Sequence, residues 1–123
     1  MSDVTSTILL IDNDQYTREL YQRELGRDFQ VLACSNESEA LDLLFHHSVD
    51  VIILEPYLDS HEGWAFLAML HTLPHTSDIP IIICSTLDER PLGFELGARY
   101  YLIKPVLPFE LLDTTHRIIP SGS

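Results

Sequence analysis

Several side chains that can bind ions come directly after short apolar runs in this sequence. They include carboxylic acids, a carboxamide, hydroxyl groups and a lysine. Carboxylates suit hard cations such as Mg²⁺, whereas a lysine ammonium suits anionic oxygen atoms. The residues are Asp12, Asn13, Asp14, Glu55, Ser85, Thr86 and Lys104, with Pro105 directly after the lysine.

The apolar runs that precede these residues have the composition of buried strands. They are short, rich in β-branched or aromatic residues, and mostly continuous rather than alternating. Continuous runs are typical of strands covered on both faces, as in a parallel sheet between helices. The runs span residues 7–11, 29–33, 50–54, 79–84 and 100–103.

Helix-forming stretches lie between these runs. Residues 15–25 form a predicted helix with Tyr16, Leu20 and Leu25 near one face. A second helix is expected to follow Asn36 as its N-cap, with Glu39 three positions on.

Proline and glycine mark the remaining helices. A third helix is expected between Gly63 and Pro74, and a last one over residues 107–119 with Pro108 in its first turn. A fourth helix is expected to be short or broken, because its segment contains Pro91, Gly93 and Gly97.

The alternation of strands and helices predicts an open, doubly wound α/β sheet. Ligands bind such sheets at the carboxyl ends of the strands, where the strand order reverses. The polar residues that follow the strands are therefore expected to gather on one edge. The alternative, that polar residues simply mark strand ends, explains any one of them but explains the whole set poorly.

Composition restricts the class of protein and its partners. The chain has 123 residues, enough for one domain with a single core. Its formal net charge of −12 disfavours binding to nucleic acid by this domain and favours basic protein partners or cations. No apolar run is long enough to span a membrane, and the N-terminal residues lack a secretory pattern, so a cytoplasmic location is expected.

The remaining reactive or aromatic side chains have ordinary structural explanations. Cys34 and Cys84 make neither a disulfide framework nor a zinc spacing and are expected to be buried packing residues. Trp64 is expected to pack against the core, with a partner contact as the alternative. The histidines are expected to be surface residues or helix-end residues rather than metal ligands, and they are His46, His47, His61, His71, His75 and His116.

Four motifs give the chain a resemblance to the receiver domains of bacterial response regulators. The segment ILLIDND resembles the family's first strand and acidic pair, and VIILEPYLDSHEG resembles its phosphoacceptor strand and loop. The segment IPIIICST resembles the strand that ends in the family's Thr or Ser, which would be Ser85. The segment GARYYLIKP resembles the one that carries the family's switch aromatic and its Lys-Pro signature. The resemblance covers essentially the whole chain, with residues 1–119 as the receiver domain and 120–123 as a tail or the start of a linker.

The resemblance implies a fold and a set of roles. The family fold is flavodoxin-like (βα)5, a parallel sheet in strand order 2-1-3-4-5. An aspartate at the position of Glu55 would accept a phosphoryl group from a histidine kinase. Mg²⁺ would be held by the acidic pair, here Asp12 and Asn13, and by the backbone carbonyl of Tyr57. Ser85, Tyr101, Lys104 and Pro105 would be the phosphoryl-sensing and switch positions.

This sequence departs from the family pattern at several positions. Glu55 is longer than aspartate by one methylene, about 1.5 Å, and misplacement on that scale can lower a rate about a hundredfold. Asn13 offers a neutral oxygen where the family has a carboxylate. Asp14 could compensate for the missing carboxylate, although its position predicts that it is the N-cap of the first helix. The segment between Ser85 and Ala98 is also shorter than in most receivers.

These departures predict a degenerate receiver, a pseudo-receiver that acts as a protein-interaction module without phosphorylation and without enzymatic activity. Its partner would be a histidine kinase, an output protein or an output domain. No cofactor is required, and any Mg²⁺ binding is expected to be weak. Glu55 either mimics a phosphoryl group, by reaching Lys104 or Ser85, or simply pairs with Lys104.

Two other functions remain as alternatives. The domain could be a working Mg²⁺-dependent phosphoacceptor that uses Glu55 or a nearby carboxylate such as Asp59. A flavodoxin-like cofactor binder would need a glycine-rich phosphate loop after the first strand, and the sequence DNDQYT has no glycine.

Overall fold

The computed structural model describes residues 5–58 and 63–119, which form a five-stranded parallel sheet flanked by helices. The strand order is β2-β1-β3-β4-β5, which confirms the fold expected from the sequence. The strands are β1 (Thr7–Ile11), β2 (Gln30–Cys34), β3 (Val51–Leu54), β4 (Ile81–Ser85) and β5 (Tyr100–Ile103). The helices are α1 (Gln15–Leu25), α2 (Glu37–His46), α3 (Gly63–Thr72), α4 (Arg90–Glu95) and α5 (Pro108–Ile118).

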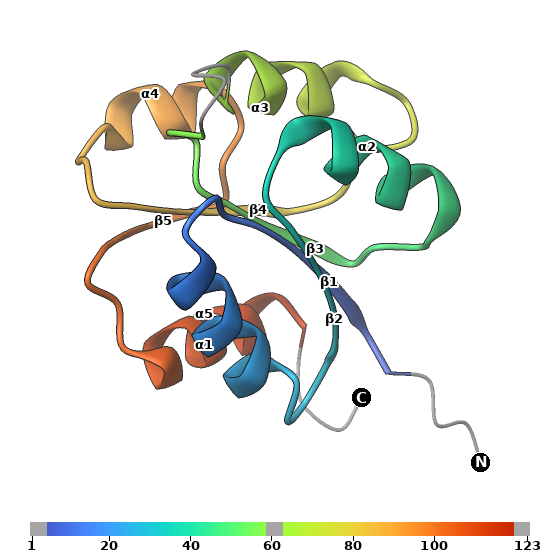
Figure 1. Ribbon diagram of the computed structural model, residues 1–123. Helices are drawn as coiled ribbons and strands as arrows, with labels where there is room; N and C mark the ends of the chain where they lie inside the picture. Colours follow the sequence, from blue (N-terminus) through green and yellow to red (C-terminus); the bar gives the residue numbers. More distant parts are fainter. Residues whose placement is uncertain (1–4, 59–62, 120–123) are drawn as a thin grey trace.

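The helices form two layers around the sheet. Figure 1 shows α2, α3 and α4 on one face and α1 with α5 on the other. Alternate strand side chains supply the two cores, because successive residues of a strand point to opposite faces. Leu9 and Ile52 belong to the cluster under α3, whereas Ile8 and Ile53 belong to the cluster under α1 and α5. Burial on both faces explains why β1, β3 and β4 are continuous apolar runs.

The buried face of α1 differs from the one expected. Leu25 is fully buried as expected, but Tyr16 is 84% exposed and Leu20 is also exposed. The second buried residue of the helix is Tyr21, which donates a hydrogen bond from its hydroxyl to the carbonyl oxygen of Val106 at 3.1 Å. Tyr16 lies nine positions before Leu25, about half a turn away around the helix axis, so the two cannot share a face.

The caps of the second and last helices are as predicted. Asn36 accepts a hydrogen bond from the backbone N–H of Glu39 at 2.9 Å, and the Glu39 carboxylate accepts one from the N–H of Ser35 at 3.1 Å. Pro108 is the first residue of α5, where its missing N–H leaves no helical hydrogen bond unmade.

Both cysteines, Cys34 and Cys84, are free and buried, as expected, and burial raises the pKa of each thiol to about 12.

The fourth helix has six residues, as the glycines and proline of its segment predicted. Gly97 follows it with a φ of 108°, a conformation that residues with a side chain rarely adopt. A Cβ atom on Gly97 would also lie 2.6 Å from the ring of His71. None of the helices in the described part of the chain is both long and apolar enough to cross a membrane.

We expect Gly97→Ala to lower the free energy of unfolding by about 1–3 kcal/mol, because the backbone conformation disfavours any Cβ atom. Urea denaturation measures the difference. Glu95→Ala is the matched control on the same segment, and its exposed side chain predicts a change within about 0.5 kcal/mol. Equal stabilities of the two variants would contradict the inference that the backbone at position 97 disfavours a Cβ atom.

Candidate functional site

The carboxyl ends of four strands bring the predicted site residues to one edge of the sheet. Asp12 follows β1, Glu55 follows β3, and Ser85 is the last residue of β4. All three side chains are buried, with Asp12 2% exposed and Glu55 6% exposed. Lys104 follows β5 and completes the group, so the convergence expected from the sequence is confirmed for these four residues.

The central contact of the site is an ion pair shared by three side chains. The Lys104 Nζ atom lies 2.8 Å from Asp12 Oδ2 and 3.0 Å from Glu55 Oε1. Burial alone lowers the pKa of Lys104, but its hydrogen bonds and charge pairing with Asp12 and Glu55 outweigh burial and raise that pKa. Near neutral pH the lysine is therefore a cation that bridges the two carboxylates.

Backbone donors occupy the second oxygen of each carboxylate. Asp12 Oδ1 accepts a hydrogen bond from the N–H of Asp14 at 2.9 Å, and Glu55 Oε2 accepts one from the N–H of Tyr57 at 3.0 Å. Burial raises the pKa of Asp12 above its ordinary value, although Lys104 acts in the opposite direction. Each of the four carboxylate oxygens thus has a donor within the protein itself.

Asp14 has the helix-capping role predicted for it. Its Oδ2 atom accepts a hydrogen bond from the backbone N–H of Thr17 at 2.9 Å, which makes it the N-cap of α1. The same bond and the Thr17 hydroxyl lower the pKa of the Asp14 carboxyl. Asp14 therefore serves the helix and does not replace the carboxylate that Asn13 lacks.

The arrangement fits Mg²⁺ poorly. Mg²⁺ requires near-octahedral oxygen ligands, usually including carboxylates that face it directly. Here Lys104 and backbone N–H groups already contact the oxygens of Asp12 and Glu55, and position 13 has a neutral side chain. Across residues 5–58 and 63–119, no group of three or more His, Cys, Asp or Glu side chains could hold a metal ion.

Two of the predicted sensing and switch positions, Ser85 and Tyr101, contact the loop between β4 and α4. Ser85 Oγ accepts a hydrogen bond from the N–H of Leu87 at 3.3 Å. The Tyr101 hydroxyl donates to the Leu87 carbonyl oxygen and accepts from the N–H of Glu89 at 3.0 Å. Burial raises the pKa of Tyr101, so this hydroxyl keeps its proton near neutral pH. Ser85 and Tyr101 together hold one arrangement of the loop.

Glycine makes room for the Tyr101 ring. A Cβ atom on Gly93 of α4 would lie 2.7 Å from a ring carbon of Tyr101, so the helix packs directly over the ring. Tyr101 is buried, and Phe94 meets it at 60° between ring planes. The short helix and the switch position are therefore one packed unit.

Other residues singled out in the sequence have less central positions. Pro105 follows Lys104 through a cis peptide bond. Trp64 is half-buried, packs against the core and meets the edge of Tyr57 at 5.8 Å between centroids. His116 lies in the last turn of α5, as expected for a helix-end histidine, and its Nε2 atom lies 2.8 Å from Asp28 Oδ2. Asp59, His61 and Glu62 lie outside the described residues.

Sequence reasoning missed the contacts that depend on the backbone and on helix geometry. Arg18 donates from its guanidinium to the Asp12 carbonyl oxygen at 2.8 Å, one turn into the helix that Asp14 caps. The positions of Leu87 and Glu89 matter through their backbone groups, which have no signature in residue type.

Comparison with known proteins identifies a family over most of the chain. Residues 8–116 match the family described as Response regulator receiver domain. The transcriptional regulatory protein GltR of Pseudomonas aeruginosa is 35% identical over 116 residues, which are 91% of this chain and 48% of GltR. The transcriptional regulatory protein HprR of Escherichia coli is 34% identical over 106 residues, 85% of this chain and 48% of HprR. The chain thus spans about half the length of these relatives.

Solved structures share the fold. A putative response regulator from Chloroflexus aurantiacus superposes with a TM-score of 0.87 at 27% identity and covers 94% of this chain and 98% of its own. The chemotaxis protein CheY4 of Vibrio cholerae superposes with a TM-score of 0.86 at 24% identity, with 94% and 99% of the two chains covered.

We expect Lys104→Met to lower the free energy of unfolding by about 3–5 kcal/mol near neutral pH, because it leaves two buried carboxylates without their cation. The pKa of Lys104 is raised above its ordinary 10.5, so its stabilisation is complete below that pH. The difference between wild type and Lys104→Met should shrink as the pH rises through the raised pKa. Denaturant unfolding across a pH series measures it.

The control for this prediction is Arg90→Met, which removes an exposed ion pair with Asp88. Exposed pairs contribute little to stability, so Arg90→Met should lower the free energy of unfolding far less than Lys104→Met does. A similarly small effect for Lys104→Met would contradict the central role of the buried pair.

Proposed function

The chain belongs to the response regulator receiver domain family, and on that premise we propose that it is a phosphorylation-independent signalling module, a pseudo-receiver. The observation that carries the proposal is the bridge from Lys104 to Asp12 and Glu55. In a receiver that accepts phosphate, the acceptor carboxylate has to be free to attack and the lysine free to meet phosphoryl oxygens. Here the two side chains contact each other.

The length of the glutamate supports the same conclusion. Its extra methylene shifts the carboxylate by about 1.5 Å from the place of an aspartate carboxylate, and in-line attack depends on geometry at that scale. Both Glu55 oxygens already have donors, Lys104 on one and the Tyr57 N–H on the other. An attack by Glu55 would first have to break these contacts inside a buried site.

Metal binding by the module would be weak. Receiver domains usually bind Mg²⁺ for phosphorylation, and the residues at the matching positions here are Asp12, Asn13 and Tyr57. Asn13 contributes no charge, and the Asp12 carboxylate is engaged by Lys104 and a backbone N–H. Any metal would have to compete with the lysine for the same oxygens, so no cofactor is required for the proposed role.

The switch residues support a fixed signalling state. Tyr101 and Ser85 hold the β4–α4 loop while Glu55 is a plain carboxylate. Glu55 brings one negative charge, whereas a phosphoryl group brings about two. Two roles for Glu55 remain: it sets the arrangement of this loop as a partial mimic, or it only pairs with Lys104.

The partners of the module would be proteins. Receiver domains interact with kinases and output domains, so the partner is a histidine kinase, an output protein or an output domain. GltR and HprR are named transcriptional regulators, but this chain spans only about half of each, and its charge of −12 opposes direct contact with nucleic acid. The cytoplasmic location expected from the sequence is part of the proposal.

The first test is direct phosphorylation. Incubation of wild type with Mg²⁺ and acetyl phosphate should leave the intact mass unchanged, because Glu55 and Lys104 contact each other. The double variant Glu55→Asp with Asn13→Asp, which restores the family pattern, should gain a phosphoryl adduct. An adduct on wild type mapped to Glu55 or Asp59 would establish the alternative, a working Mg²⁺-dependent phosphoacceptor.

The second test concerns the loop. Tyr101→Phe removes both hydrogen bonds of the hydroxyl, so we expect faster hydrogen exchange at the Glu89 amide and a loss of about 1–2 kcal/mol in unfolding free energy. Tyr100→Phe is the control, because it removes a neighbouring hydroxyl outside this contact. Unchanged exchange at Glu89 in Tyr101→Phe would contradict the proposed hold on the loop.

The same exchange measurement on Glu55→Ala separates the two roles of the glutamate. Faster exchange at Glu89 would assign it control of the loop. Unchanged exchange there would restrict its role to the pair with Lys104.

A further inference from the structure

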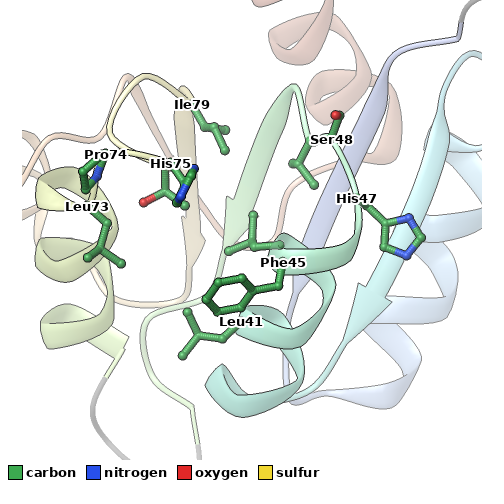
Figure 2. Close-up of a pocket in the computed structure, with 11 residues that line it drawn as sticks. Leu41, Phe45, His47, Ser48, Leu73, Pro74, His75 and Ile79 are labelled. Carbon is green, nitrogen blue, oxygen red and sulfur yellow. The ribbon is translucent and has the colours of Figure 1, made fainter.

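A pocket lies at the edge of the sheet opposite the ion-pair site. It occupies about 460 Å³, within the range of roughly 300–1,000 Å³ typical of ligand sites. Figure 2 shows it between the last turns of α2 and α3. The turns after these helices lead into β3 and β4, so the pocket sits where those strands begin. The proposed function uses nothing at this edge.

The lining is mainly apolar. Leu41 and Phe45 come from α2, and Leu73, Pro74 and Ile79 come from the segment that follows α3 (Figure 2). The Phe45 side chain is 80% exposed, although phenylalanine side chains are usually buried. Exposed aromatic rings beside a pocket are typical anchors of protein interfaces.

Exposed carboxylates and no lysine or arginine lie in or directly beside the segments that line the pocket, which also include His47 and His75. All lysines and arginines of the chain lie within residues 18–27 or 90–117, outside the segments that line the pocket. Asp42, Asp50 and Asp78 are exposed and lie in or directly beside those segments. The carboxyl ends of α2 and α3 add the partial negative charge of two helix dipoles.

This pattern of charge selects among the classes of occupant. Nucleic acid and anionic membranes would be repelled by an acidic rim. A second copy of the chain would bring the same acidic rim and a net charge of −12 against it. A basic segment of a partner protein meets both requirements, because its cations face the aspartates while an apolar side chain fills the cavity.

We propose that the pocket between α2 and α3 docks a basic amphipathic segment of a partner protein. An apolar side chain of that segment enters the pocket beside Phe45, and its lysines or arginines lie against Asp42, Asp50 and Asp78. The proposal specifies partner chemistry for the module, so it rests on the proposed function. The surface itself lies far from Glu55 along the strands and does not depend on its state.

The test is an NMR titration of the ¹⁵N-labelled chain with a synthetic amphipathic helix of leucine and lysine, at about pH 7.5, where histidines are ordinarily neutral. We expect shift changes centred on residues 41–49 and 73–79. Phe45→Ala should weaken binding about tenfold, as loss of an anchor does. Phe109→Ala, an exposed phenylalanine on α5, should change it less than twofold. Ser48→Trp, which obstructs the pocket from an exposed position, should act like Phe45→Ala.

Variants of the leucine and lysine peptide distinguish the proposed occupant from other modes of binding. A peptide with alanine for leucine should bind much more weakly, and equal binding would overturn the proposal in favour of simple charge adsorption. A peptide with glutamate for lysine should not bind, and equal binding would overturn the role of the aspartates. Shifts of the pocket residues with protein concentration alone would point to a second copy instead. Shifts centred away from the pocket, or no binding, would also overturn it.

Failure of this proposal is distinguishable from failure of the proposed function. The mass measurement reports on Glu55 and is blind to the pocket. The titration reports on the opposite edge of the sheet and gives the same result whether or not Glu55 accepts phosphate.

Discussion

The buried ammonium of Lys104 is the constraint on which the arrangement of the site depends. Two carboxylates removed from water require a cation and further donors, since an unpaired buried charge costs several kcal/mol. Lys104 supplies the cation, and the backbone N–H groups of Asp14 and Tyr57 supply the remaining donors. The ends of β1, β3 and β5 must therefore stay in register with one another. The same contacts that satisfy the buried charges also occupy the groups that phosphoryl chemistry would use.

The β4–α4 loop is also held by side chains that bind backbone groups. The Tyr101 hydroxyl and Ser85 bind backbone groups of the loop, and Gly93 lets α4 settle on the Tyr101 ring. Through these contacts the Tyr101 ring and the two hydroxyl groups hold the loop and α4 against the sheet.

The two edges of the sheet have opposite character. The edge at the carboxyl ends of the strands is buried, charged and internally satisfied. The edge at their amino ends carries an apolar pocket with an exposed Phe45 and an acidic surround. A parallel sheet produces this separation, because every strand end of one kind lies on the same side. The docking surface proposed above therefore lies at the edge away from the ion pair.

The sequence by itself determined the strands, the order of the elements and the edge of the sheet at which Asp12, Glu55, Ser85 and Lys104 lie. Continuous apolar runs could be strands buried on both faces, and the polar residues after them had to meet at one edge. Proline and glycine also fixed the shortness of α4. The buried face of α1 could not be read in the same way, because Tyr16 and Leu20 are apolar enough for either face. Packing against α5 selected Tyr21 and Leu25 instead.

Only the tertiary structure decided which residues contact one another. Glu55 could have reached Ser85 or Lys104, and its Oε1 atom lies 3.0 Å from Lys104 Nζ, whereas Ser85 Oγ accepts from the N–H of Leu87. The sequence placed Asp12 and Glu55 near a lysine but could not show that one ammonium serves both. Nor could it show the pocket, whose walls come from α2 and from the segment after α3. Such contacts join residues distant in the chain, and their geometry follows from packing, which residue type and spacing do not encode.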